Sequence, residues 1–189
     1  MRIALLVEGQ TERALLPVLR RYLQARLGGG MPRLSPRLFH GRIPTGQKLK
    51  RWVGLLLAEA DAVVALPGAG DAKDRMREWV GKEPRFHPHA AQYEFEAWLL
   101  PYWSEIQRLS GSNRSGPSGN PEAVDHNRPP SRWIQEAFRS GSKGRSYVKP
   151  RDARRILDGQ DLEVAAAACA ELRLFLNTLL TLGTSGYRD

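Results

Sequence analysis

The sequence begins with residues 1–23, MRIALLVEGQTERALLPVLRRYL. In this stretch a continuous apolar run is followed by apolar residues at helical spacing. Ile3 to Val7 is a continuous apolar run, the pattern of a strand buried on both faces of a parallel sheet. From Leu15 onward the apolar residues follow helical spacing, and Thr11 is expected to cap that helix through its hydroxyl. This stretch therefore predicts a β-strand followed directly by an α-helix.

Two acidic residues occupy the junction between this strand and this helix. Glu8 stands at the carboxyl end of the strand, and Glu12 stands near the start of the helix. Ligands collect at that edge of open α/β sheets, so the two carboxylates could hold a divalent cation such as Mg²⁺. The helix dipole alone also favours an acid at a helix start, so a purely structural role stays open.

The pattern of strand and helix continues along the first half of the chain. Helices are expected over residues 47–60 and 71–80, and a second buried strand over residues 61–66. Weaker strand patterns cover residues 37–43, after a turn-rich stretch at 31–36, and residues 85–92, where Pro88 indicates an edge strand. Apolar strands alternating with helices predict an α/β fold with a mostly parallel sheet flanked by helices.

The second half of the chain is richer in loops and helices. Residues 93–109 are expected to be mostly helical with a kink at Pro101, and residues 110–131 form a long loop. Helices are also expected over residues 131–138, 151–157 and 162–182, with Asp161 capping the last. We therefore expect an α/β core over residues 1–109 and a C-terminal helical portion over residues 110–189 that packs on the same domain.

Composition and charge limit the classes of function. The chain has 189 residues, a net charge of +9 and no apolar run long enough to span a bilayer. Its start lacks the organisation of a signal peptide, and Cys169 is its only cysteine, so we expect a cytoplasmic protein without disulfides. Ten basic residues and no acid occupy residues 13–51, and nine basic residues with two acids occupy residues 128–155. These two basic segments are expected to converge on a face next to the sheet edge that carries Glu8 and to bind nucleic acid there, although a solvated basic surface is the alternative.

A second group of candidate site residues lies in residues 87–100, HPHAAQYEFEAWLL. Glu94 and Glu96 are set among aromatic and apolar residues, where a carboxylate is costly unless it meets a metal, a base or a backbone amide. Either could therefore be a further metal ligand or orient the site. His87 and His89 have a spacing that zinc sites use, but no Cys or third His supports them. We expect both histidines to be solvated residues of an edge strand.

The third candidate is the basic loop, residues 142–151, SKGRSYVKPR. Its basic side chains could bind a phosphate backbone while its tyrosine stacks on a base, and a lysine there could also stabilise charge on a scissile phosphate. The predicted nucleic-acid-binding residues are Lys143, Arg145, Tyr147, Lys149 and Arg151. An ordinary basic surface loop accounts for the same pattern.

Several of these stretches together resemble a known family. VEGQTE at residues 7–12 resembles the opening motif of Toprim domains, the fold of topoisomerases, primases and OLD-family nucleases, whose first-strand glutamate is catalytic. Three further motifs occur later in the chain: YEFEAWLL at 93–100, NPE at 120–122 and Tyr-x-Lys at 147–149. With these motifs, nearly the whole chain resembles the Toprim-clan domain-of-unknown-function family 4276. Toprim domains also carry an Asp-x-Asp pair after the third strand. Here Leu66 runs into Pro-Gly-Ala-Gly, and the first acid is Asp71.

The resemblance implies a function and a set of site residues. Glu8 and Glu12 would be catalytic and would hold Mg²⁺ or Mn²⁺, with Asp71, Glu94 and Glu96 as further metal ligands. Because the Asp-x-Asp pair is missing, either Asp71 reaches back to the metal, or the site has decayed, or the natural loop is longer. Capping of the following helix is the structural alternative for Asp71.

Family members are commonly encoded beside an OLD-type ATPase. The resemblance therefore implies a nuclease that works with such a partner in defence against foreign DNA. The alternative is a non-catalytic nucleic-acid-binding or ATPase-partner subunit, which the acid-poor turn after Leu66 favours. A homo-oligomer is compatible with both hypotheses.

Overall fold

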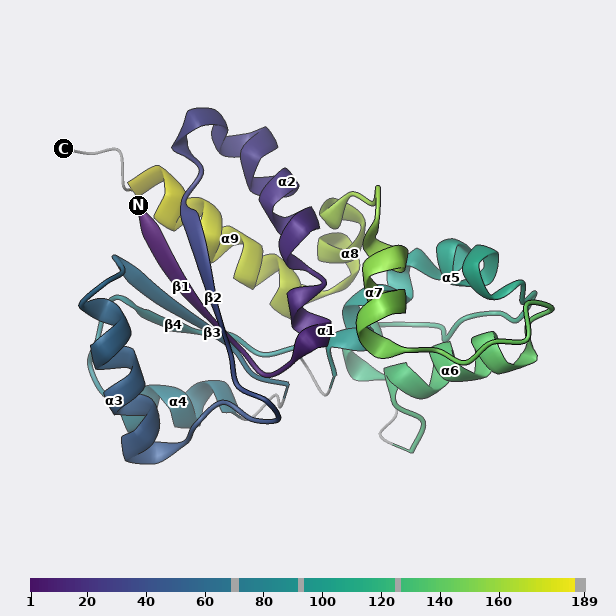
Figure 1. Ribbon diagram of the computed structural model, residues 1–189, viewed down its shortest axis with the longest axis horizontal. Coiled ribbons are helices and arrows are strands. Elements are labelled where there is room, and N and C mark those ends of the chain that lie inside the picture. Colours follow the sequence, from purple (N-terminus) through teal and green to yellow (C-terminus); the bar gives the residue numbers. More distant parts are fainter. Residues whose placement is uncertain (69–71, 92–93, 125–126, 186–189) are drawn as a thin grey trace.

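A four-stranded parallel sheet forms the centre of the protein (Figure 1). The computed structural model describes residues 1–68, 72–91, 94–124 and 127–185. The strands are β1 (Arg2–Val7), β2 (Arg33–Leu38), β3 (Ala62–Leu66) and β4 (Phe86–Pro88), in the spatial order β2-β1-β3-β4. β1 pairs in parallel with both β2 and β3, so the predicted α/β class and the adjacency of the two buried strands are confirmed.

Helices connect and cover the strands. They are α1 (Gln10–Arg13), α2 (Leu16–Leu27), α3 (Gly46–Leu57), α4 (Ala72–Val80), α5 (Trp103–Ser110), α6 (Pro130–Ser140), α7 (Lys149–Leu157), α8 (Leu162–Ala168) and α9 (Ala170–Ser185). Shorter 3₁₀ segments are η1 (Gly28–Gly30), η2 (Phe95–Tyr102) and η3 (Pro121–Ala123). Across the described ranges, no helix is both long and apolar enough to cross a bilayer.

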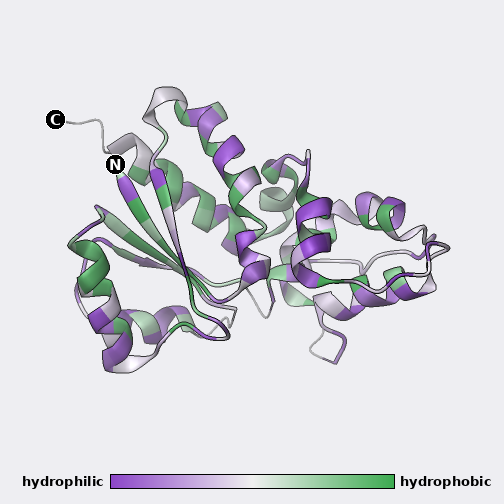
Figure 2. Ribbon diagram, viewed as in Figure 1, coloured by the Kyte–Doolittle hydropathy of each residue, from purple (hydrophilic) through white to green (hydrophobic). Residues whose placement is uncertain are grey.

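Each face of the sheet has its own apolar core. Ile3, Leu5 and Val7 of β1 pack with residues of α2 and α9, whereas Ala4 and Leu6 pack with residues of α3 and α4. Side chains on both faces are buried, which accounts for the continuous apolar run of this strand in the sequence. The same arrangement is visible in Figure 2, where the central strands are hydrophobic and the helices have polar outer faces.

The C-terminal half contributes to one of these cores and extends beyond the sheet. α9 lies along the sheet, whereas α5, α6 and α7 lie beyond the carboxyl ends of the strands, on the right in Figure 1. Ile134, Phe138 and Phe175 belong to the same buried cluster as Leu5 and Val7. The core is therefore continuous between the sheet and the C-terminal helices.

The first helix starts earlier and is less regular than predicted. Gly9, not Thr11, is the N-cap residue, and no side chain caps α1. Thr11 is the second residue of α1, so its predicted capping role is wrong. A break at Ala14 and Leu15 separates α1 from α2. There the Ala14 and Leu15 amides donate to the carbonyls of Thr11 and Glu12, which is the three-residue spacing of a 3₁₀ turn.

Other element boundaries also differ from prediction. β2 includes Pro36 and starts in the stretch expected to be a turn, because an edge strand tolerates a residue without an N–H. Residues 95–102 form a 3₁₀ segment that contains Pro101, and regular α-helix starts only at Trp103. The predicted last helix is broken at Cys169 into α8 and α9, and Asp161 caps α8 through a 3.0 Å bond from the Glu163 amide.

Candidate functional site

Glu8 lies where the carboxyl ends of three strands meet. Its Oε2 accepts a 2.9 Å hydrogen bond from the Gly68 amide, just after β3. Its Oε1 accepts a 3.4 Å bond from the Ile43 amide, in the segment that follows β2. The parallel register brings these ends together, since Val7 pairs with both Leu38 and Leu66. The Glu8 carboxylate is thus fixed by main-chain groups at the edge of the sheet where it was predicted.

Glu12 projects from α1 beside Glu8 and has an unsatisfied oxygen. Its Oε2 is buried and has no hydrogen-bond partner within the described part of the chain. A Cβ atom added to Gly9 would lie 3.2 Å from this oxygen, so the glycine leaves room for the carboxylate. Burial raises the pKa of Glu12 and the nearby charge of Glu8 adds to the rise, while the backbone amides of Glu12 and Gly9 partly offset it. A buried carboxylate oxygen without a donor is the kind of group that a cation would satisfy.

Glu8 and Glu12 therefore fit a magnesium or manganese ion by donor chemistry. Mg²⁺ takes oxygen ligands and is commonly held by one or two carboxylates, with water and substrate phosphates completing its octahedron. Within the residues the structure describes, no group of three or more His, Cys, Asp or Glu side chains is placed to hold a metal. Asp71 lies outside the described residues, so its predicted role as a ligand stays a prediction.

Glu94 and Glu96 converge on a lysine. Lys149 Nζ, at the start of α7, lies 3.1 Å from Glu96 Oε1 and 3.7 Å from Glu94 Oε1. Glu94 also accepts bonds of 2.8 Å and 3.0 Å from the amide and hydroxyl of Ser131. The Tyr147 hydroxyl donates a 3.4 Å bond to Glu96, whose side chain is buried. We name Glu94, Glu96, Tyr147 and Lys149 the lysine cluster.

Opposing effects set the protonation of the lysine cluster. Burial raises the pKa of Glu96, and the Lys149 ammonium only partly offsets that rise. Burial by itself would lower the pKa of Lys149, but the charges of Glu96 and Glu94 overcome it and the net shift is upward. Lys149 is therefore a stable cation on a side chain that is still partly exposed to solvent.

The lysine cluster and the Glu8–Glu12 pair are electrostatic neighbours. Glu12 and Lys149 each shift the other's pKa, and α1 contacts α7. Two carboxylates and one fixed cation thus adjoin at the carboxyl edge of the sheet. The predicted ligands Glu94 and Glu96 are near this edge, but their oxygens are already paired with Lys149, Ser131 and Tyr147.

The rest of the predicted basic loop is bonded within the protein. Arg145 and Arg151 both pair with Asp152, at 2.8 Å and 2.9 Å, and the Asp152 side chain is fully buried. Lys143 Nζ donates a 2.7 Å bond to the Arg108 carbonyl. These contacts give the loop a structural role, and its binding of nucleic acid stays a prediction.

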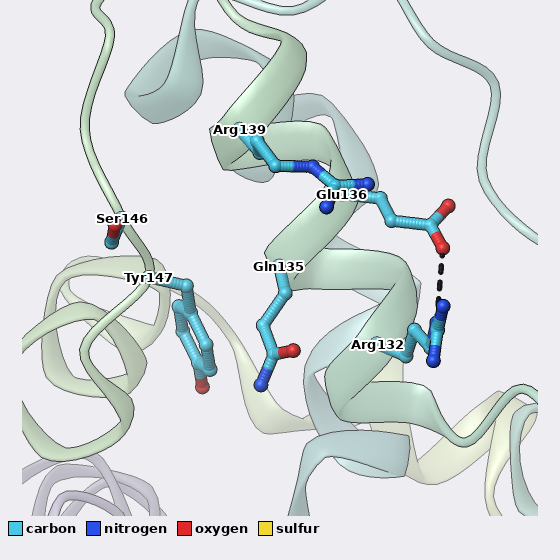
Figure 3. A pocket seen from close by; sticks show the side chains of 6 residues that line it. All are labelled: Arg132, Gln135, Glu136, Arg139, Ser146 and Tyr147. Carbon is cyan, nitrogen blue, oxygen red and sulfur yellow. Dashed lines mark hydrogen bonds and ion pairs between the residues drawn. The ribbon is translucent and has the colours of Figure 1, made fainter.

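Tyr147 faces a hollow on α6 but is itself mostly covered. The hollow is lined by Arg132, Gln135, Glu136, Arg139, Ser146 and Tyr147 (Figure 3). The Tyr147 ring is 9% exposed and packs against Phe138, with ring centroids 5.5 Å apart. Its burial and the Glu96 charge raise the pKa of Tyr147. In this conformation the ring has no open face on which a base could stack.

The predicted solvation of the histidines is wrong for His89. This residue is 7% exposed, its Nε2 lies 3.0 Å from Thr178 Oγ1 of α9, and its ring packs edge-on against Phe175. Burial lowers the pKa of His89 to about 4, and burial also lowers the pKa of His87. β4 is an edge strand as predicted, but α9 covers one of its faces.

Several residues with defined roles were not predicted from sequence. The amides of Ile43 and Gly68 fix Glu8, and Ser131 fixes Glu94. Glu122 accepts bonds from Trp98 Nε1 at 2.9 Å and from the Glu171 amide at the start of α9 at 3.0 Å. The Asn120-Pro-Glu stretch has the pattern of a local cap, and Asn120 does accept a 2.9 Å bond from the Glu122 amide. No local pattern could indicate the long-range partners.

Comparison with known proteins places this geometry in a family and a fold. A family model described as "Domain of unknown function (DUF4276)" matches residues 7–180. Among solved structures, the C-terminal region of the Burkholderia pseudomallei OLD protein is similar, with a TM-score of 0.53 and 16% sequence identity. The similarity covers 96% of this chain and 98% of that one, so the two share a fold over their length. No curated protein matches the chain.

Proposed function

This chain belongs to the DUF4276 family, and we propose that it is a nuclease of Toprim type that cleaves phosphodiester bonds in nucleic acid with Mg²⁺ or Mn²⁺. One observation carries the proposal. The Glu8 carboxylate is fixed by the Gly68 and Ile43 amides next to a buried, unpartnered oxygen of Glu12. These two carboxylates would provide a place for a cation at the sheet edge where α/β proteins bind ligands.

The protein's own groups have separate parts in such a reaction. Glu8 and Glu12 would hold the metal, which neutralises charge on the phosphate and lowers the pKa of a bound water. Lys149 would stabilise negative charge developing on the phosphate, because its ammonium is held beside Glu94 and Glu96 and its side chain is 43% exposed. Glu94 and Glu96 would position Lys149, which gives them a part in the site without binding the metal.

The shared fold supports a partner for this activity. The structural neighbour is one region of a larger protein, the OLD protein of Burkholderia pseudomallei. We propose that this chain works with a separately encoded ATPase of OLD type in defence against foreign DNA. The two chains together would then correspond to one OLD protein.

A non-catalytic subunit is the second candidate, and one observation favours it. Between β3 and Gly68 the chain supplies no carboxylate, so within the described residues the Glu8–Glu12 pair has no third acidic ligand. A nucleic-acid-binding or ATPase-partner subunit could keep the fold with this reduced site. The two candidates differ in whether metal-dependent cleavage can be detected.

The test is cleavage of supercoiled plasmid in Mg²⁺ and in Mn²⁺, with and without the neighbouring ATPase. Glu8→Gln is nearly isosteric but removes the charge that balances the cation, so cleavage should fall by at least about a hundredfold. Glu12→Gln should also lower cleavage. Mn²⁺ binding, followed by electron paramagnetic resonance, should weaken in both variants.

The matched control is Glu78→Gln, which removes one exposed carboxylate from α4 on the opposite face of the sheet. It should leave both cleavage and Mn²⁺ binding unchanged. Cleavage that persists in Glu8→Gln would assign the activity to another site or to a contaminant. Absence of cleavage under every condition, with no Mn²⁺ bound, would favour the non-catalytic subunit.

A further inference from the structure

A hollow beside the candidate site collects arginines from both halves of the chain. It is lined by residues of α1, α2, β2 and α7. Of these elements, α1 and α7 are in contact and are neighbours in Figure 1. Arg13 and Arg20 line it from the N-terminal side, and Arg154 lines it from α7. Among the described residues that line it, none carries a carboxylate. The two basic segments of the sequence therefore meet here.

These three arginines differ from several arginines of the C-terminal half, whose charge is already paired. Arg145 and Arg151 are neutralised by Asp152, while Arg114, Arg128 and Arg132 all pair with Glu136. By contrast, Arg13, Arg20 and Arg154 are exposed and have no hydrogen bond or ion pair with any described residue. These three arginines therefore bring unneutralised positive charge together in this hollow, from both halves of the chain.

The hollow adjoins the segments that carry Glu12 and Lys149. Arg13 follows Glu12 in α1, and Pro150 of the hollow follows Lys149 of the lysine cluster. A chain of phosphates held by the arginines would therefore pass beside Glu12 and Lys149. Pro17, Pro36 and Pro150 give the hollow rigid apolar surface, which suits the sugars between phosphates.

We propose that this arginine hollow is where the phosphate backbone of nucleic acid binds, and that it guides the backbone to Glu8 and Glu12. The inference rests on the proposed nuclease function and adds the binding surface to it. Arginine matches phosphate oxygens with a planar fork of donors, and exposed arginines bind phosphates without reading base sequence. This assignment moves the main binding surface from the basic loop to the groove between α1, α2 and α7.

The test uses the triple variant Arg13→Gln, Arg20→Gln and Arg154→Gln in the full-length protein. Binding of fluorescent single-stranded and duplex DNA, and of RNA, is measured by anisotropy in EDTA, where metal-dependent cleavage cannot occur. The variant should bind at least about tenfold more weakly at low salt. The slope of log affinity against log salt should become shallower by about two to three, roughly one for each lost phosphate contact.

Two control variants separate local from general electrostatics. Replacing Lys48, Lys50 and Arg51 of α3 with Gln removes the same charge from the opposite face of the sheet and should leave affinity nearly unchanged. Replacing the three hollow arginines with Lys keeps the charge and should restore most of the binding. Equal losses from the hollow and α3 variants would show that only net charge matters and would overturn the assignment.

The outcomes also distinguish this inference from the proposed function. Binding that depends on the hollow, without cleavage by the parent, keeps the inference and rejects the nuclease. Cleavage by the parent that the triple variant retains, with unchanged binding, rejects the inference and keeps the nuclease. A parent that binds no nucleic acid, or binds polyglutamate equally well, rejects the hollow as a nucleic-acid site.

Discussion

The position of Glu8 depends on a glycine far away in sequence. A Cβ atom at Gly68 would lie 3.0 Å from Glu8 Oε2, tighter than an ordinary contact, while the Gly68 amide holds that same oxygen. The backbone of Gly68 has no positive φ, so alanine fits its conformation. Position 68 therefore controls the carboxylate without bearing a functional side chain.

Gly68→Ala should displace the Glu8 carboxylate and weaken Mn²⁺ binding by about tenfold or more, as with other groups that orient metal ligands. Its melting temperature should change little, since no strand contact is lost. Gly54→Ala in α3, where an added Cβ meets nothing within 4 Å, is the matched control. It should stabilise the protein by about 0.5–1 kcal/mol and leave Mn²⁺ binding alone. Unchanged Mn²⁺ affinity in Gly68→Ala would contradict the role assigned to this contact.

His89 should make stability fall in mild acid. Burial lowers its pKa to about 4, with the charges of Lys73, His87 and Arg77 adding to the effect. The unfolded chain, with a pKa near 6.5, takes up the proton first, so stability is full above about pH 6.5 and is lost as the pH falls toward 4. The complete loss is about 3 kcal/mol.

Urea unfolding of the parent and of His89→Gln between pH 7 and pH 4 measures this effect. Glutamine keeps an amide that can reach Thr178 but does not titrate, so the variant should lose less stability over that range. Glu12 and Glu96 titrate in both proteins, and their contributions cancel in the difference. Parallel pH profiles for the two proteins would show that His89 is not the group responsible.

At the scale of single residues, the sequence predicts where a side chain lies in the fold better than it predicts which side chain it pairs with. Glu8 is at the predicted sheet edge because strand and turn are local patterns. Arg145 and Arg151 were predicted to face phosphates, yet both pair with the buried Asp152. Tyr147 has a buried ring although it lies in a polar loop. Such pairings depend on tertiary contacts that leave no periodic signal in the sequence.

At the scale of elements, the strands with continuous apolar runs were predicted and the helix ends were not. β1 and β3 form as expected because burial on both faces dictates their composition. No Gly or Pro near Cys169 in the sequence indicates that the helix breaks there. At this break the side chain of Glu122, a residue distant in sequence, accepts hydrogen bonds from the Glu171 and Leu172 amides at the start of α9. A tertiary cap therefore replaces the continuous helix that the spacing indicated.

Glu122→Ala should destabilise the protein by about 2–4 kcal/mol, because it leaves buried donors of α9 and Trp98 unsatisfied. Glu122→Gln keeps one acceptor oxygen and should cost less. Chemical denaturation gives both values, and Trp98 fluorescence reports whether its environment changes. Asp74→Ala, at a solvent-exposed ion pair with Arg77 in α4, is the control and should cost less than about 1 kcal/mol. A similar loss in both alanine variants would contradict the capping role.

At the scale of the whole molecule, the candidate site combines residues from both ends of the chain. Glu8 and Glu12 come from the first strand and helix, whereas Lys149 comes from α7, and the continuous core fixes one against the other. The sequence predicted that the two basic segments converge next to this sheet edge, but not which of their arginines stay unpaired there. The arginine hollow emerges only once the pairings with Asp152 and Glu136 are known.

The order of the strands also has a consequence for how this protein can associate. The two outer strands, β2 and β4, contain Pro36 and Pro88. Proline has no N–H to offer an added strand, so neither border of the sheet can be lengthened with a complete hydrogen-bond ladder. Copies of this chain are thereby hindered from joining strand to strand into fibres. A stable assembly, including one with an ATPase, is therefore expected to form through the helices and loops that surround the sheet.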